Sequence, residues 1–202
     1  MMNFKKDLTI GQEAEKYFSR TAEGWEVLEV DDDNKSYYDL KLICGERNIT
    51  VEVKNDIASH KTGNLGFEYQ QTDWRGGKKP SGFMISKADY WVHFYYFKKS
   101  VPVKGKYIMV DLAYLRAFLF GIVIKSGKYK IIPDAGDNGN DLMIVKREIC
   151  ESLFSATEKI KKCSIHTLSE NEIKTKLKKT FKEIEKNSKE WLDDKLSGIT
   201  IT

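Results

Sequence analysis

The sequence predicts an α+β fold or a mixed α/β sheet. A helical pattern comes first, most predicted strands then follow one another directly, and a second helix comes late. This order differs from the regular strand–helix alternation of doubly wound folds. The chain has 202 residues, of which 41% are hydrophobic and 32% charged. It is therefore long enough for one sizeable core and has the composition of a globular protein.

The first predicted element is a helix over residues 7–20. Ala14 and Phe18 fall on one face of it, and Thr9 is the expected N-cap. Residues 25–30 alternate between apolar and polar side chains, which predicts a strand.

Strands dominate the middle of the chain. Two alternating segments joined by residues 45–48 (Gly-Glu-Arg-Asn) predict a β-hairpin, and further apolar or alternating runs follow it. A helix capped by Asp111 interrupts these runs. The expected strands cover residues 39–44, 49–54, 64–71, 82–86, 88–97, 106–110 and 128–133, and the expected helix covers residues 111–120.

The end of the chain changes character. Ser169 and Glu172 form a capping box, and apolar residues then recur at helical spacing among many lysines and glutamates. We therefore divide the chain into a core domain, residues 1–158, and a lysine-rich helical extension, residues 159–202. The extension could clamp DNA, form a dimer or dock on the core.

Targeting signals are not evident in the sequence. No apolar run approaches the roughly 20 residues that span a bilayer, and the N-terminal stretch turns polar too early for a signal peptide. We expect a cytoplasmic protein without membrane contact. The net charge of +4 is too small to establish nucleic-acid binding, although lysine-dense segments of this kind release counterions from phosphates.

The predicted hairpin places three charged side chains on one face of the sheet. With a four-residue turn, Asp39 lies opposite Lys54, and Lys41 lies opposite Glu52. Asp39, Glu52 and Lys54 then share a face, while the apolar residues of both strands fall on the other face and can pack into a core.

Two carboxylates and an amine are the groups that metal-assisted phosphodiester hydrolysis uses. Carboxylate oxygens are the ligands that Mg²⁺ prefers, and the metal polarises a phosphate and lowers the pKa of water. A lysine beside that water orients it and offsets the developing charge. An ordinary surface ion pair, such as Glu52 with Lys41, is the alternative, and on the hairpin alone it is the better explanation.

The surrounding sequence resembles the PD-(D/E)XK nuclease superfamily. Asp39 matches the aspartate at the start of its central hairpin, and residues 52–54, Glu-Val-Lys, match its E-x-K motif. Gly11 and Glu15 have the G-x-x-x-E spacing of its first helix. Tyr38 departs from the pattern, because many members have proline there.

The resemblance extends beyond the motif. Residues 62–69 (TGNLGFEY) and 80–91 (PSGFMISKADYW) are similar to segments of phage and bacterial nucleases, including Holliday-junction-resolvase-like members. All matches together lie between Ile10 and Trp91.

The resemblance implies a restriction-endonuclease-like fold, with a central mixed sheet flanked by helices, and an endonuclease that hydrolyses DNA with Mg²⁺, or with Mn²⁺ as its substitute. By analogy, Asp39, Glu52 and the carbonyl of Val53 bind the metal. Lys54 positions the attacking water.

The resemblance also implies a further acidic residue on the first helix. Glu15 has the matching spacing and would act through a second metal or a bound water, and Glu13 is the alternative. Substrate contacts are expected from the loops and strands near the site. Each of these residues, taken alone, is better explained as an ordinary surface residue. These residues are Lys61, Asn64, Glu68, Lys78 and Lys87.

DNA, including branched DNA, is the expected partner of this enzyme. A homodimer is expected by analogy, because many nucleases of this type cut two strands as symmetric dimers. If the chain is encoded by a phage, its compartment is the host cytoplasm. Two other functions stay open: a catalytically silent DNA-binding module on the same fold, and a protein-interaction module such as a phage-encoded inhibitor.

Overall fold

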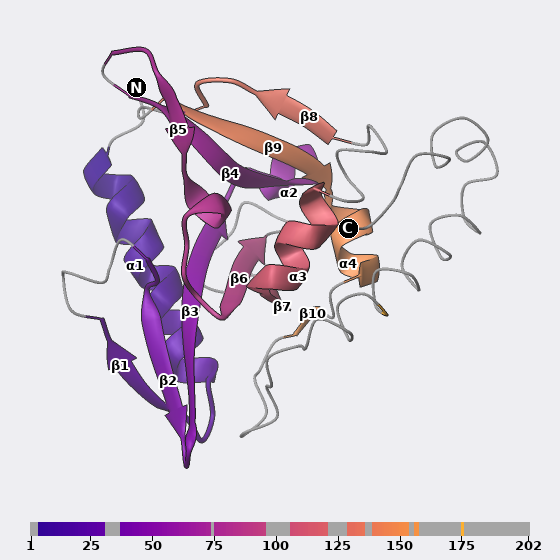
Figure 1. Ribbon diagram of the computed structural model, residues 1–202. Coiled ribbons are helices and arrows are strands. Elements are labelled where there is room, and N and C mark those ends of the chain that lie inside the picture. Colours follow the sequence, from indigo (N-terminus) through magenta and orange to yellow (C-terminus); the bar gives the residue numbers. More distant parts are fainter. Residues whose placement is uncertain are drawn as a thin grey trace.

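The computed structural model describes residues 4–30, 37–73, 75–95, 106–120, 129–135, 139–153, 156–157 and 175. These residues form an α+β fold with two β-sheets, as predicted for the class (Figure 1). The predicted C-terminal extension lies outside the described residues, apart from Thr175. No described helix is long and apolar enough to cross a membrane.

The larger sheet, sheet A, has the strand order β1-β2-β3-β6-β7-β10. β3 and β6 run parallel, and the other neighbouring strands pair antiparallel, so the sheet is mixed. Every residue of β6 is buried, because this strand lies inside the sheet and both of its faces are covered. The strands are β1 (Glu26–Glu29), β2 (Leu40–Cys44), β3 (Arg47–Asp56), β6 (Tyr90–Tyr95), β7 (Lys106–Asp111) and β10 (Ala156–Thr157).

The smaller sheet, sheet B, has the strand order β5-β4-β9-β8, with all pairs antiparallel. Its strands are β4 (Asn64–Thr72), β5 (Lys78–Pro80), β8 (Tyr129–Ile132) and β9 (Asn140–Lys146). Leu65 and Phe67 of β4 point inward at alternate positions, together with Met143 and Val145 of β9. Sheet B therefore has one buried face.

One face of sheet A is covered by the helix α1 (Phe4–Thr21). Ala14 and Phe18 lie four residues apart on the helix and pack on the apolar side chains of β2, β3 and β6. The Phe18 ring meets Tyr107 of β7 edge-on, with ring centroids 5.5 Å apart. The helix begins before the expected start, so Thr9 lies within it and the predicted N-cap is wrong.

The other face of sheet A packs on sheet B and on the helix α3 (Leu112–Ala117). The expected mixed sheet flanked by helices is thus found in part, because α1 covers one face of sheet A while the layer on the other face is mainly sheet B. Asp111 caps α3 as predicted, because its Oδ1 accepts a hydrogen bond from the Tyr114 N–H at 3.0 Å.

Several short elements differ from the predicted ones. Residues 82–86 were expected to form a strand, but Gly82–Met84 form the 3₁₀ turn η1. The helix α2 (Ser59–Thr62) and the strand β5 lie where loops were expected. The helix α4 (Arg147–Leu153) follows β9 directly.

Candidate active site

β2 and β3 form the predicted hairpin, but with a shorter turn. Lys41 pairs with Thr50 and not with the expected Glu52. The turn contains two residues and begins at Gly45, whose φ of 63° is the left-handed conformation that tight hairpin turns require. The predicted register is therefore wrong by two residues. A shift of two keeps every side chain on its predicted face, so the shared face is retained.

Asp39 lies directly before β2 and is bonded to β3 by backbone and side chain. Its N–H donates to the Val51 carbonyl at 2.9 Å, and its Oδ2 accepts from the Val53 N–H at 2.7 Å. The ladder begins at Leu40, which pairs with Val51, so Asp39 does not lie opposite Lys54 as expected. Its Oδ1 makes no hydrogen bond with any residue that the structure describes.

Glu52 and Lys54 lie two residues apart on β3, so their side chains leave the same face. Lys54 Nζ is 2.5 Å from Glu52 Oε1 and 5.7 Å from the ring centroid of Trp91 on β6. Glu52 is only 8% exposed, whereas the Lys54 side chain is 37% exposed. The Lys54 amine is thus the part-exposed member of this ion pair, and the Glu52 carboxylate is the buried member.

The three charged groups shift one another's pKa values. Burial raises the pKa of Asp39 and that of Glu52, and Lys54 opposes both shifts without cancelling them. The charge of Asp39 raises the pKa of Glu52 further. Burial alone lowers the pKa of Lys54, but Glu52, Asp39 and Glu68 outweigh it and raise that pKa. Two crowded, partly desolvated carboxyl groups favour an additional cation beside them.

The donor set of this site fits a divalent cation. Mg²⁺ usually takes one or two carboxylates from a protein and completes its shell with water and substrate phosphate. Asp39 Oδ1 is available for such an ion, and Glu52 lies on the same face. In the described part of the chain no group of three or more His, Cys, Asp or Glu side chains is arranged to hold a metal. The carboxylates that could hold an ion here are those of Asp39 and Glu52.

Glu15 is not brought to this site. It lies on α1, which packs through Ala14 and Phe18 on the apolar face of sheet A. The carboxylates of the site leave the opposite face of that sheet. Glu13, the alternative, is exposed on the same helix.

Three of the expected substrate contacts come from α2 and β4. Lys61 is exposed on α2, and the side-chain amide of Asn64 donates to a backbone carbonyl at the end of α2, at 3.0 Å. Glu68 accepts a hydrogen bond from the hydroxyl of Ser81, and its charge raises the pKa of Lys54. Glu68 is therefore the one of the three that electrostatics connects with the site.

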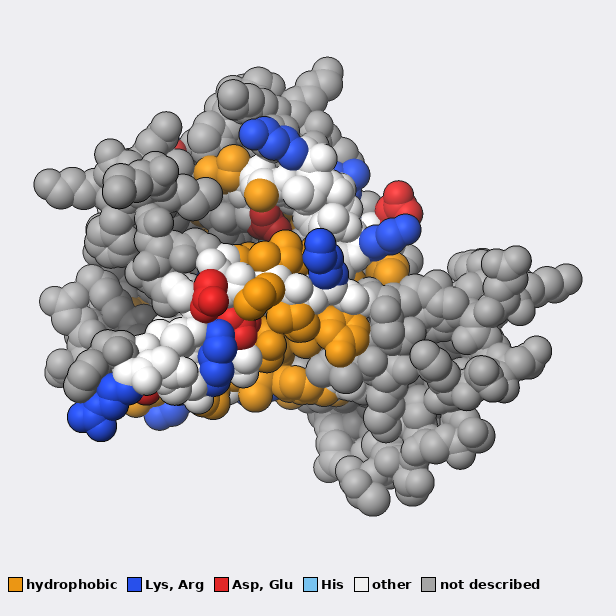
Figure 2. Space-filling view, turned by 90° about the horizontal axis from the view of Figure 1, so that it is seen from above, with side chains coloured by type: hydrophobic (Ala, Val, Ile, Leu, Met, Phe, Trp, Pro, Cys, Tyr) orange, Lys and Arg blue, Asp and Glu red, His pale blue; other side chains and the backbone are white. Residues whose placement is uncertain are grey.

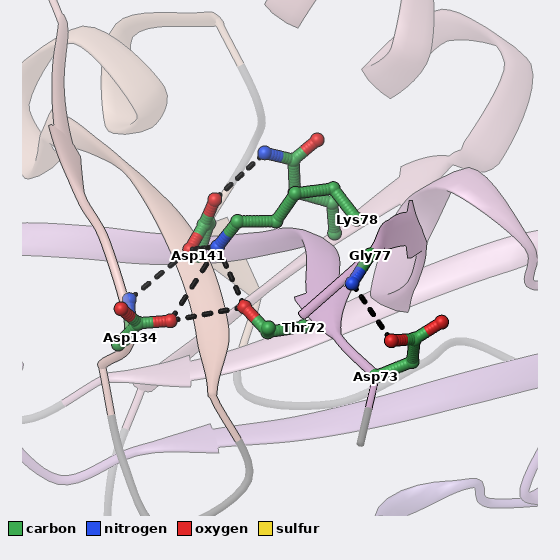
Figure 3. Close-up of polar contacts among 7 residues, drawn as sticks. Thr72, Asp73, Gly77, Lys78, Asp134 and Asp141 are labelled. Carbon is green, nitrogen blue, oxygen red and sulfur yellow. Dashed lines mark hydrogen bonds and ion pairs between the residues drawn. The ribbon is translucent and has the colours of Figure 1, made fainter. Parts of the chain in front are cut away.

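The Lys78 ammonium contacts side chains of sheet B and of the turn before β9 (Figure 3). Its Nζ lies 2.9 Å from Asp141 Oδ1, 3.4 Å from Asp134 Oδ1 and 2.7 Å from Thr72 Oγ1. Asp141 has little exposed surface, and the ammonium neutralises its carboxylate. The geometry gives Lys78 a structural role between β5 and the turn that precedes β9.

Lys87 lies beside the site. Its N–H donates to the Tyr37 carbonyl at 2.9 Å, and its Nζ stands 3.6 Å from the centroid of the Tyr37 ring. The preceding residue, Ser86, contacts Glu52. An exposed lysine held at this position is suited to contact a phosphate next to the carboxylates.

Positive side chains are distributed over the surface that Figure 2 shows. The lysines and arginines stand apart from one another around a central area of hydrophobic side chains. Among the residues that the structure describes on this face, the positive charge is spread and does not form one block.

Sequence analysis gave no role to two residues that the structure connects with the carboxylates. Ser86 Oγ lies 3.3 Å from Glu52 Oε2, and Arg116 of α3 donates to carbonyls of the turn that carries Ser86. Neither residue has a local signal, because a lone serine and a helical arginine are typical of ordinary surface. Only the tertiary fold brings Ser86 to β3 and Arg116 to the turn that carries Ser86.

Comparison with protein-family models, with curated proteins and with solved structures found no match to this chain. The geometry of the site is thus the basis for assigning a function.

Proposed function

We propose that the chain is a metal-dependent endonuclease that hydrolyses phosphodiester bonds in DNA. The observation that carries the proposal is the meeting of Asp39, Glu52 and Lys54 on one face of the β2–β3 hairpin. A buried and a half-buried carboxyl group with raised pKa values, next to a part-exposed amine, form a pattern found more often at functional sites than in ordinary surface.

The proposed fold is restriction-endonuclease-like. Its support is the order of α1, β1 and the β2–β3 hairpin, together with the parallel pairing of β3 with β6. This part of the chain carries all the residues that resemble the PD-(D/E)XK motif. Sheet B and α3 are then additions that cover the second face of sheet A.

The residues of the proposed centre divide into those that bind the metal and one that acts on the attacking water. Asp39, Glu52 and the Val53 carbonyl hold Mg²⁺ or Mn²⁺, which when bound polarises the scissile phosphate and lowers the pKa of water. Lys54 Nζ donates a hydrogen bond to the attacking water and offsets charge that develops on the phosphate. Glu15 has no role in the proposed centre, because it lies on the helix that covers the other side of sheet A.

One observation favours the second candidate, a catalytically silent DNA-binding or protein-interaction module. The Lys54 ammonium already contacts Glu52 at 2.5 Å, and such an ion pair can serve structure alone. A cation at the site has to share Glu52 with that ammonium. The two functions therefore differ in whether a divalent ion competes successfully for Glu52.

Cleavage assays separate the two candidates. The substrates are supercoiled plasmid and branched DNA, each with Mg²⁺, with Mn²⁺ and with EDTA. The endonuclease predicts metal-dependent cleavage that Lys54→Ala reduces at least about 100-fold and that Lys130→Ala, an exposed lysine of β8, leaves unchanged. Equal background nicking by wild type and Lys54→Ala contradicts it. Salt-sensitive DNA binding in EDTA, unchanged in Asp39→Asn and without cleavage, supports the silent module.

A further inference from the structure

Ser86 contacts both segments that carry the carboxylates, β3 and the residues just before β2. Its hydroxyl lies 3.3 Å from Glu52 Oε2 and 3.0 Å from the carbonyl of Tyr37, two residues before Asp39. The residue is 4% exposed, so water does not replace these partners. One hydroxyl has one proton and two acceptors here, and it accepts a third contact from the Ala88 N–H at 3.3 Å.

Arg116 holds the backbone on which Ser86 lies. Its Nε donates to the Phe83 carbonyl at 2.8 Å, and its Nη2 donates to the Ser86 carbonyl at 2.5 Å and to the Met84 carbonyl at 3.4 Å. These carbonyls lie at the end of η1, where a helical turn leaves its acceptors unpaired. The planar guanidinium reaches them from two nitrogen atoms in a fixed geometry, whereas a lysine has a single nitrogen.

The start of the same turn is fixed to sheet B. The Ser81 N–H donates to the Tyr69 carbonyl at 3.0 Å, and the Ser81 hydroxyl donates to Glu68. A Cβ at Gly82 would lie 2.1 Å from the Glu68 carbonyl oxygen, so only glycine allows this approach. The segment from Ser81 to Ser86 is thus anchored at both ends, and its last side chain contacts Glu52.

We propose that Ser86 is a positioning residue that orients the Glu52 carboxylate for a divalent cation, and that Arg116 fixes Ser86 for this task. The inference rests on the proposed metal-dependent function. Hydrogen bonds to the far oxygen of a metal-binding carboxylate set its orientation, and their removal typically weakens metal binding 10- to 100-fold. An ion that takes Glu52 Oε1 shares that oxygen with the Lys54 ammonium, while Ser86 keeps its contact with the far oxygen, Oε2.

The test is calorimetric titration of the full chain with Mn²⁺ alone, paired with a thermal melt of each variant. Ser86→Ala is expected to bind Mn²⁺ about tenfold more weakly than wild type, and Ser86→Thr, which keeps the hydroxyl, recovers most of that loss. The Mn²⁺ affinity of Arg116→Lys is expected to lie between the affinities of wild type and Ser86→Ala. Ser81→Ala is the matched control, because Ser81 is an equally buried serine of the same segment that contacts Glu68 and not Glu52.

The outcomes distinguish this inference from the proposed function. Wild-type affinity in Ser86→Ala overturns the inference, and so does a loss of melting temperature in Ser86→Ala without a loss of affinity, because both leave Ser86 a structural residue. If Ser86→Ala does not fold, wild-type affinity in Arg116→Lys overturns it. If wild type itself shows no Mn²⁺ binding that Glu52→Gln removes, the metal centre fails and the positioning role fails with it.

Discussion

The carboxylate of Asp39 accepts a hydrogen bond from the backbone N–H of Val53 at 2.7 Å. Val53 separates Glu52 from Lys54, so this bond fixes one carboxylate relative to both other groups of the site. An asparagine side chain keeps an oxygen that can accept the same bond. The effect of the Asp39 charge can therefore be measured separately from the effect of its hydrogen bond to Val53.

Asp39→Asn is expected to raise the melting temperature in EDTA at about pH 7 while it abolishes activity. Burial raises the folded-state pKa of Asp39 above its ordinary value, with Lys54 and the Val53 N–H opposing. An acid with a raised folded-state pKa makes the ionised form unfavourable in the fold, and this cost disappears as the pH falls through that pKa. The rise in melting temperature that Asp39→Asn produces therefore becomes smaller as the pH falls toward about 4.

A second melt checks the cause of this gain. Mn²⁺ stabilises wild type, because it binds the folded state only, and it does not stabilise Asp39→Asn. A lower melting temperature of Asp39→Asn at neutral pH would show that the Asp39 charge stabilises the fold, which is the opposite of our account.

Gly82→Ala is expected to destabilise the chain more than Gly76→Ala. Both glycines have positive φ, 52° and 80°, so both variants lose about 1–2 kcal/mol from backbone strain. A Cβ at Gly82 also meets the Glu68 carbonyl at 2.1 Å, whereas a Cβ at Gly76 meets no atom within 4 Å. Urea denaturation measures the difference. Equal losses in the two variants would exclude close packing of the turn against β4.

Lys78→Met is expected to reduce stability and to leave DNA affinity close to that of wild type. Its hydrogen bond to Asp141, with those from Gln70 and the Asp134 N–H, lowers the pKa of Asp141 from 3.8 to about 2. Because the folded-state pKa is lowered, this stabilisation is present above about pH 4 and is lost as the pH falls toward 2.

Melting temperatures between neutral pH and pH 2 measure the effect of Lys78. Wild type loses more stability in acid than Lys78→Met, because the variant has already lost the ammonium. Lys79→Met is the control, since Lys79 is an exposed neighbour on β5. A large loss of DNA affinity in Lys78→Met at unchanged stability would instead support the substrate contact that the sequence predicts.

His93→Leu is expected to cost about 1–3 kcal/mol of unfolding free energy, and His93→Gln to recover part of it. His93 is 1% exposed, its Nδ1 accepts from Trp91 Nε1 at 3.3 Å, and its Nε2 lies 3.4 Å from Asp56 Oδ2. The indole contact places the proton on Nε2, which then donates to Asp56. Glutamine offers one acceptor and one donor as well. If glutamine and leucine have the same effect, the two hydrogen bonds contribute nothing.

The sequence allowed the faces of the hairpin to be predicted, but not its register. Alternation of apolar and charged residues determines which side chains are buried, and this part of the prediction is confirmed for Leu40, Leu42, Val51 and Val53. The register depends on the turn, where four residues were expected and two are found. A shift of two residues leaves every side chain on its face, so the pattern contains no information about it.

The second sheet and η1 were harder to predict for a related reason. Residues 82–86 are a short apolar run, and periodicity alone does not distinguish a strand from a buried turn of that length. The pairing of β4 with β9 joins residues that are 69 to 82 positions apart, so no local pattern indicates it.

The candidate site was predictable only in the part that lies on one hairpin. Asp39, Glu52 and Lys54 share a short segment with strict alternation. Ser86 and Arg116 reach the site through tertiary contacts of a turn and a helix. Glu15 fits the expected spacing, but the helix presents its buried face to the other side of sheet A.

The measurement that tests the central claim most directly is anomalous diffraction from crystals soaked in Mn²⁺. Our account predicts an anomalous peak bound by Asp39 and Glu52 together, with the Lys54 amine beside it, and no such peak in Glu52→Gln crystals. It is contradicted if the soaked crystals show Mn²⁺ only at other sites while Lys54 still pairs with Glu52.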